Sequence, residues 1–353
     1  MLIDKYIEKM IDLGGSDLFL RCNAEPKLRI HGEIVSIDEA EISADQMLKI
    51  VKEIVPHEDL DTLQARRNYE GAFYFRTDWR MRVSIFYQRG SLALVIRKIN
   101  LKFSTLEELN LPAKVLETLC KEKRGMVLLT GTTGSGKSTT IATMIEYINL
   151  NFRAHILSIE DPIEFTFTDK KAIINQREIG KDVETYAAAL RQFALHSPDV
   201  IFIGNIRDEE TMRAALEAAE TGVLVFSTLH TVNAAQTVER IVSFFPPYQH
   251  EQILMQLSQI LKGVVSLRLV PLKEGSGLVP AYEVMVLSPT VSRLIRENKI
   301  WEIPRYIEEG DVYGMVSFEQ NFVKLVKEGK VNPEVAISFS DKKEELRLRL
   351  QDV

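Results

Sequence analysis

The chain has 353 residues and a formal net charge of −6, from 44 Lys and Arg against 50 Asp and Glu. Hydrophobic residues make up 45% and charged residues 27%, a composition that excludes disordered and collagen-like proteins. The length predicts two domains, each large enough to bury a core. The acidic balance argues against nucleic acid as a partner. The two cysteines show no metal-ligand spacing and no apolar stretch is long enough to cross a membrane, so we expect a cytoplasmic protein.

The first 100 residues predict a small α+β domain. An amphipathic helix opens it, with one apolar face formed by Leu2, Ile3, Tyr6, Ile7, Met10 and Ile11. Short strands follow at 17–20, 27–30, 72–76, 81–87 and 92–98, with turn signals at His31-Gly32 and Arg89-Gly90. Residues 101–112 are interpreted as a linker.

From residue 113 to the end, apolar strands alternate with helices. The strands are expected at 125–130, 154–159, 200–204 and 223–228. Continuous apolar strands of this kind are buried on both faces of a parallel sheet. The second domain, 113–353, is therefore expected to be α/β. A helical extension is expected from about residue 249, interrupted by a hairpin near 273–277.

A phosphate-binding loop follows the first of these strands. The segment GTTGSGKS at 131–138 matches GxxxxGK[ST] between a strand and a helix, which is the context the motif requires. Its glycines let backbone N–H groups converge on a phosphate, Lys137 neutralises the β- and γ-phosphates, and Ser138 can bind Mg²⁺. With no guanine-reading NKxD segment, ATP with Mg²⁺ is the expected ligand. The residues expected to bind it are Gly131, Thr132, Thr133, Gly134, Ser135, Gly136, Lys137, Ser138 and Thr139.

Three further segments each stand at the end of an apolar strand: SIEDPIE at 158–164, DVIFIGNIRD at 199–208 and STLHT at 227–231. An α/β sheet places its chemistry at these carboxyl ends. With the loop, the segments resemble the Walker A, Asp box, Walker B and His box of the secretion-superfamily hexameric ATPases. The resemblance includes GGSDL at 14–18 and AETG at 219–222, and covers nearly the whole chain.

Within that superfamily, the short first domain and the lack of a tetracysteine zinc motif resemble the retraction ATPases of type IV pili, the PilT/PilU family. Segments 82–89, 244–246 and 345–350 look more like the PilU branch. The resemblance implies a PAS-like α+β N-terminal domain, a RecA-like α/β ATPase domain with a helical C-terminal extension, and a homohexameric ring. It also implies two partners, the inner-membrane platform protein of the pilus machine and a paralogous retraction ATPase, and a cytoplasmic location at the inner membrane.

The resemblance also implies roles for single residues. Glu160 is expected to activate the attacking water, because Mg²⁺-dependent hydrolysis needs a carboxylate there. Asp161 and Glu164 are expected in the metal shell or in its loop, and His230 is expected to sense the γ-phosphate. The alternatives are a helix-capping acidic turn and a structural histidine.

Three arginines are further candidates. Arg82 and Arg97 fall on adjacent predicted strands and resemble arginines that contact nucleotide phosphates at the seam between the two domains. The planar donor fork of Arg suits phosphate oxygens, although solvent-facing strand arginines would give the same pattern. Arg207, in the Walker B segment, is expected near the nucleotide or at a subunit contact.

One position departs from the family pattern. Gly-Glu follows the Walker B strand in the family, whereas this chain has Gly204-Asn205. Asn can hydrogen-bond a water but cannot accept a proton or supply negative charge to Mg²⁺. Loss of a general base lowers the rate of the catalysed reaction by about 10²-fold or more. Three explanations stay open: an engineered substitution, a naturally weak or inactive paralogue, and a working enzyme in which Glu160 suffices.

Near the C-terminus, SRLIRE at 292–297 resembles the AIRNLIRE motif of retraction ATPases and is expected on a helix with Leu294 and Ile295 inward. The function that follows is a hexameric motor that hydrolyses ATP to power pilus retraction and twitching motility. The alternative is a hydrolysis-poor, PilU-like subunit that binds ATP and assists an active motor. A small-molecule kinase and a DNA-translocating ring are the remaining alternatives.

Overall fold

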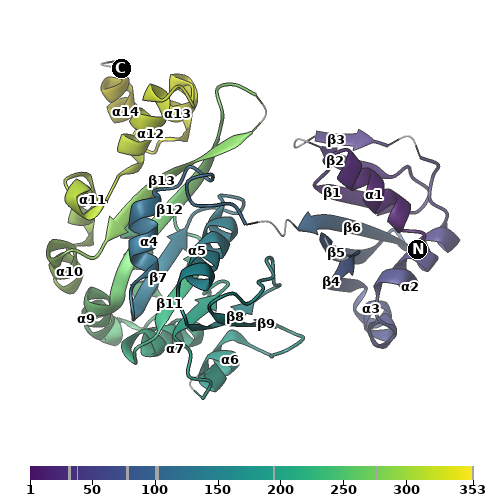
Figure 1. Ribbon diagram of the computed structural model, residues 1–353, viewed down its shortest axis with the longest axis horizontal. Coiled ribbons are helices and arrows are strands. Elements are labelled where there is room, and N and C mark those ends of the chain that lie inside the picture. The colour runs from purple at the N-terminus through teal and green to yellow at the C-terminus, as the bar shows by residue number, and fades with distance from the viewer. Residues whose placement is uncertain are drawn as a thin grey trace. The chain divides into compact units, whose positions relative to one another are not determined.

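The computed structural model describes residues 1–30, 33–37, 39–76, 79–99, 103–193, 195–275 and 277–351. The chain divides into two compact units, Met1–Lys102 and Phe103–Val353 (Figure 1). The turn predicted at His31-Gly32 and the start of the predicted linker, at 101 and 102, lie outside the described residues. No helix in the described ranges is long and apolar enough to cross a membrane.

The N-terminal unit is a six-stranded antiparallel sheet in the order β3-β2-β1-β6-β5-β4, with helices packed on it. The strands are β1 (Asp17–Arg21), β2 (Lys27–Ile30), β3 (Glu33–Ser36), β4 (Asn68–Phe75), β5 (Trp79–Gln88) and β6 (Ser91–Ile99). The helices are α1 (Asp4–Asp12), α2 (Ala44–Ile54), the 3-10 turn η1 (His57–Asp59) and α3 (Leu60–Arg66).

The first predicted helix and the five predicted strands are confirmed. Around α1, the residues Ile3, Tyr6, Ile7 and Met10 are buried, because positions three and four apart share one face of a helix. The sequence interpretation missed α2, α3 and β3. Helix α2 carries a recognisable signal, since Ser43 and Gln46 form a capping box at its start. Strand β3 was not predicted because none of its residues is buried, and an exposed strand does not need the alternating apolar pattern by which strands are recognised.

The larger unit contains a seven-stranded sheet in the order β13-β12-β7-β11-β10-β8-β9. Its strands are β7 (Gly125–Thr130), β8 (His155–Glu160), β9 (Ile173–Glu178), β10 (Val200–Ile203), β11 (Leu224–Leu229), β12 (Leu261–Pro271) and β13 (Leu278–Val286). Its helices are α4 (Ala113–Cys120), α5 (Lys137–Asn151), α6 (Tyr186–Phe193), α7 (Glu209–Glu220), α8 (Ala234–Ser243), α9 (His250–Ile260), α10 (Pro289–Arg296), α11 (Ile303–Glu308), α12 (Phe318–Lys327), α13 (Pro333–Phe339) and α14 (Lys343–Leu350). The 3-10 turns are η2 (Pro247–Gln249), η3 (Ile300–Glu302) and η4 (Asp311–Tyr313).

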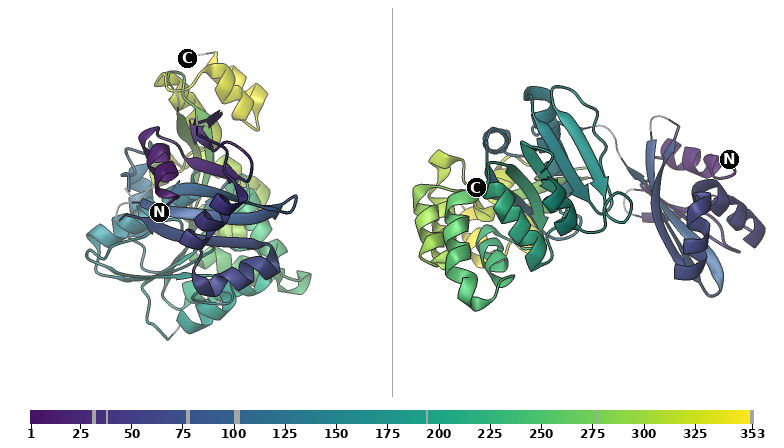
Figure 2. Two further views of the ribbon diagram at one scale, coloured as in Figure 1. Left: turned by 90° about the vertical axis from the view of Figure 1, so that its right-hand side faces the viewer. Right: turned by 90° about the horizontal axis from the view of Figure 1, so that it is seen from below.

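Helices cover both faces of this sheet (Figure 2). Residues of α6 to α10 pack in the apolar core on one face, and residues of α4 and α5 pack in the core on the other. Every residue of β7, β10 and β11 is buried, as two-sided cover requires. The prediction of an α/β sheet of continuous apolar strands is confirmed.

The C-terminal part differs from the expected helical extension. Helix α9 begins at His250, but β12 and β13 follow it directly and extend the main sheet. The turn predicted near 273–277 falls between them, with residue 276 outside the described residues, and the two strands pair from Gly263 and Val286 to Pro271 and Leu278. Strand β12 pairs in parallel with β7. The apolar pattern passes from α9 into β12 without a turn residue, which is why the boundary was missed.

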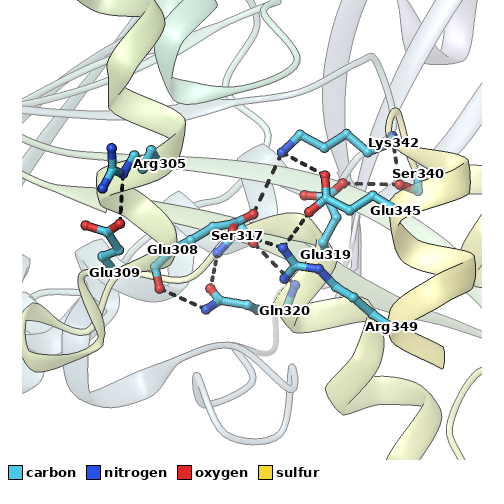
Figure 3. A network of polar contacts seen from close by, with 10 residues as sticks. All are labelled: Arg305, Glu308, Glu309, Ser317, Glu319, Gln320, Ser340, Lys342, Glu345 and Arg349. Atoms are coloured by element: carbon cyan, nitrogen blue, oxygen red, sulfur yellow. Dashed lines mark hydrogen bonds and ion pairs between the residues drawn. The ribbon is translucent and has the colours of Figure 1, made fainter. Parts of the chain in front are cut away.

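The last helices pack against the end of the β12–β13 pair and are joined to each other by ion pairs (Figure 3). Arg349 of α14 lies 2.9 Å from Glu308 of α11, and Lys342 lies 3.3 Å from Glu345. Ser340 donates a hydrogen bond to Glu319 of α12 at 3.1 Å. This network holds α11, α12 and α14 together on one side of the larger unit.

Candidate nucleotide site

Parallel register brings the carboxyl ends of four strands to one edge of the larger sheet. Thr130 of β7 pairs with Leu229 of β11, and Ile203 of β10 pairs with both Ser227 of β11 and Ile159 of β8. The segments that leave these strands therefore start side by side. They are the four segments that the sequence singled out.

The phosphate-binding loop has the backbone that its sequence predicts. Its backbone has positive φ at three glycines, with 140° at Gly131, 78° at Gly134 and 96° at Gly136. Residues other than glycine rarely adopt such φ values. The ammonium of Lys137 folds back on this loop and donates hydrogen bonds to the carbonyl oxygens of Gly131 (2.7 Å) and Thr132 (2.8 Å). Burial lowers the pKa of Lys137, and the nearby Glu164 carboxylate partly offsets this effect.

These features fit a phosphate. The loop leads into α5, whose first N–H groups have no acceptor within the helix and carry partial positive charge. The hydroxyl of Ser135 is buried, and no hydrogen-bond partner for it exists among the described residues. A phosphate would supply acceptors to these donors and to Lys137. Ser138, half-buried in the first turn of α5, is suited to hold Mg²⁺ beside it.

Glu160, the predicted water-activating residue, is the last residue of β8 and is only 5% exposed. Its carboxylate accepts hydrogen bonds from the Ser158 hydroxyl (2.7 Å), the Gln176 amide (3.1 Å) and the backbone N–H of Glu164 (3.4 Å). Burial raises the pKa of Glu160 to about 7, against the lowering effect of these donors. A carboxylate with this pKa can take up a proton at neutral pH. Its catalytic role stays a prediction.

The two other acidic residues of this segment are exposed. Asp161 and Glu164 both face solvent, and Glu164 is the charged group that acts on Lys137. The loop between them is held from β9, because the N–H of Ile163 donates a hydrogen bond to Glu178 at 3.2 Å. The expected place of Asp161 and Glu164 in a metal shell stays a prediction.

Asn205 and His230 are brought together. Asn205 Nδ2 lies 3.3 Å from His230 Nε2, so the amide donates when this ring nitrogen is unprotonated. The pKa of His230 is lowered by burial and by the positive charges of Lys137 and Arg207, which favours that neutral form. Asn205 Oδ1 is buried, and the described part of the chain offers it no hydrogen-bond partner.

Tyr186 is a site residue that the sequence interpretation missed. Its hydroxyl lies 3.3 Å from the position that a Cβ on Gly204 would take. Burial raises the pKa of Tyr186, Asp161 and Glu160 add to this effect, and Arg207 opposes it. Tyr186 is the first residue of α6, far in sequence from every motif, and no local pattern marks it.

Two of the predicted arginines come from the smaller unit. Arg82 and Arg97 belong to the N-terminal unit, where they are direct cross-strand partners on β5 and β6, as expected of adjacent strands. Arg97 pairs with Asp17 at 2.7 Å and Arg82 with Glu70 at 3.4 Å. Their contact with a nucleotide stays a prediction.

The SRLIRE segment lies on α10, as expected. Leu294 and Ile295 are buried, and Arg293 and Arg296 are exposed. Ser292 donates a hydrogen bond to the carbonyl oxygen of Ser258 on α9 at 2.6 Å. The segment thus packs on α9 through its apolar side.

Comparison with known proteins shows that the chain is similar to proteins of secretion and pilus systems. Residues 1–277 match the protein family described as Type II/IV secretion system protein. The chain is 37% identical over 351 residues to the type IV pilus ATPase PilU of Pseudomonas aeruginosa, covering 99% of this chain and 92% of that protein. It is 42% identical over 311 residues to a twitching motility protein of Neisseria gonorrhoeae, covering 88% and 83%.

A solved structure agrees over both units. The chain is similar to the crystal structure of the pilus retraction motor PilT with bound ADP, with a TM-score of 0.91 and 42% identity over 98% of this chain and 99% of that one. Legionella pneumophila DotB, at 23% identity and a TM-score of 0.81, shares the fold. The predicted fold class, a RecA-like ATPase domain with a smaller N-terminal domain, is confirmed.

Two glycines of the phosphate-binding loop should differ in their tolerance of a side chain. A Cβ on Gly131 would lie 2.4 Å from the carbonyl oxygen of Leu267, whereas on Gly134 it would have no described heavy atom within 4 Å. We expect Gly134→Ala to cost about 1–2 kcal/mol from the left-handed backbone alone. Gly131→Ala should cost at least about 2 kcal/mol more through the overlap. Urea unfolding measures both, and equal costs would contradict this loop geometry.

The contact between Asn205 and His230 is testable by titration. Asn205→Asp places a carboxylate beside the imidazole, which favours the protonated ring and should raise the pKa of His230 by about one pH unit. NMR of histidine-labelled protein measures this pKa. The control is Asn175→Asp, at a second amide–imidazole pair with His155, which should leave the pKa of His230 unchanged. An unaltered His230 pKa in Asn205→Asp would show that the contact does not form in solution.

Proposed function

The chain belongs to the Type II/IV secretion system protein family, and on that premise we propose that it is an ATP-driven motor that powers retraction of type IV pili. The observation that carries this function is the shared edge of β7, β8, β10 and β11, where a phosphate-binding loop meets Glu160, Asn205 and His230. Relatives named for pilus retraction and twitching motility match nearly the whole chain.

We propose a task for each side chain, and the contacts that each one makes support it. Lys137 exchanges the carbonyl oxygens of Gly131 and Thr132 for phosphate oxygens, and the first turn of α5 supplies backbone donors. Glu160 orients the attacking water and accepts its proton. His230, neutral and next to Asn205, contacts the γ-phosphate side of the site. Bound Mg²⁺ supplies charge neutralisation, and Ser138 and Asp161 are the residues proposed to hold it.

The remaining parts of the proposal concern assembly. Six copies form a ring, Arg82 and Arg97 of the N-terminal unit contact phosphate, and Arg207 binds the nucleotide or stabilises the subunit contact. The ring acts in the cytoplasm on the inner-membrane platform protein of the pilus machine, with a paralogous retraction ATPase as a further partner. The similarity to pilus ATPases over both units supports this assembly.

A second candidate is a hydrolysis-poor accessory subunit. It is favoured by Asn205, which cannot act as a base and instead contacts His230, and by the similarity to PilU. Such a subunit would bind ATP in the same site and assist an active motor.

Steady-state phosphate release with Mg²⁺-ATP separates these candidates when this chain and Asn205→Glu are compared. For the motor we expect comparable turnover in both, because catalysis rests on Glu160, and Glu160→Gln should lower it by about 10²-fold. For the accessory subunit we expect ATP binding with turnover only after Asn205→Glu. Transfer of phosphate to an acceptor other than water would refute both candidates and indicate a kinase.

A further inference from the structure

We propose that Glu283 is a positioning residue for His230: its carboxylate fixes the first turn of α8, and with it the loop that carries the histidine. This inference rests on the proposed function, because it concerns the same site. It adds a residue from β13, a strand outside the four segments recognised in the sequence.

Glu283 lies on β13, is 8% exposed, and accepts a hydrogen bond from the backbone N–H of Ala234 at 2.8 Å. Ala234 is the first residue of α8 and is fully buried. The first N–H groups of a helix have no acceptor within it, and a buried one without a partner is costly. Asn233 caps the same helix through the N–H of Gln236 at 2.9 Å. Glu283 and Asn233 thus each accept a hydrogen bond from a different N–H group of this first turn.

The same turn is joined to the His230 loop. Residues 231–233 alone separate His230 from α8. The Thr237 hydroxyl, one turn into α8, donates to the carbonyl oxygen of Asn233 at 2.7 Å and lies 2.7 Å from the Thr231 hydroxyl. Because these bonds bind the loop to the helix, a shift of the start of α8 would move His230.

Glu283 stands at the level of the phosphate-binding loop. It pairs in register with Ser266 of β12, and Ser266 pairs with Thr130 of β7. The Thr130 hydroxyl also donates to the Ser266 hydroxyl at 2.8 Å. Thr130 is the residue before Gly131, so three neighbouring strands link the start of the loop to the acceptor that holds α8. The sheet thereby fixes His230 relative to the bound phosphates.

The groups around the Glu283 carboxylate shift its pKa in opposite directions. Burial raises the pKa of Glu283 to about 7, and Glu319 of α12 adds to the rise. The Ala234 hydrogen bond, Arg268 of β12 and Lys342 before α14 act in the opposite direction. Glu319 and Lys342 belong to the polar network of the C-terminal helices (Figure 3). The bond to Ala234 needs only an acceptor, which Gln would also provide.

The test compares Glu283→Ala with Glu283→Gln, in this chain and in the Asn205→Glu background. Glu319→Gln is the matched control, because it alters a neighbouring carboxylate that accepts its hydrogen bond from Ser340 and not, among the described residues, from the first turn of α8. We expect Glu283→Ala to lower kcat for Mg²⁺-ATP about tenfold, which is the loss of about 1.4 kcal/mol, with KM unchanged. Glu283→Gln and Glu319→Gln should retain the kcat of their parent.

Hydrogen exchange supplies a readout that does not depend on turnover. In Glu283→Ala, residues 230–238 should exchange faster and gain no protection from Mg²⁺-ATP, while the phosphate-binding loop is protected as in the parent. Equal exchange and equal kcat in Glu283→Ala and parent would overturn the proposal. A joint change of kcat and KM with loss of stability would also overturn it, as a purely structural role. Failure of the proposed function is distinguishable, because it appears in the unaltered parent, which then binds no nucleotide or transfers phosphate to an acceptor other than water.

Discussion

The site depends on one constraint, the parallel backbone register of β7, β11, β10 and β8. Hydrogen bonds between these strands set their carboxyl ends at one level, so segments that are up to 100 residues apart in sequence start side by side. The strands can keep this register because helices bury both of their faces, and a slip of one residue would send each core side chain to the opposite face. This register is what brings the phosphate-binding loop close to the acidic segment, Asn205 and His230.

This constraint also explains what the sequence could predict. Strands β7, β10 and β11 can be recognised in the sequence because burial on both faces requires an unbroken apolar run. The phosphate-binding loop can be recognised because its glycines and Lys137 are close together in the sequence. Strands β12 and β13 fall within the predicted helical extension, since the apolar pattern of α9 continues into them. The contact of Asn205 with His230, the place of Tyr186 beside Gly204 and the bond from Ala234 to Glu283 join distant segments. No spacing along the chain encodes these contacts.

Asn205 gives the site its particular chemistry. A carboxylate there would stand next to an imidazole and favour its protonated form, whereas the amide leaves His230 neutral and able to accept. The buried Asn205 Oδ1 remains available for a donor such as a water. Glu160, whose pKa of about 7 results from burial at the end of β8, is the residue proposed for acid–base work. The proposed division between ATP binding and hydrolysis therefore rests on two neighbouring strand ends, those of β8 and β10.

The most direct measurement is a structure of this chain with Mg²⁺ and a non-hydrolysable ATP analogue. We expect the phosphates to lie on the loop 131–138, the Lys137 ammonium to leave the carbonyl oxygens of Gly131 and Thr132 to bind them, and His230 to face the γ-phosphate. A nucleotide bound elsewhere, or a Lys137 that keeps both carbonyl contacts while nucleotide is present, would contradict it.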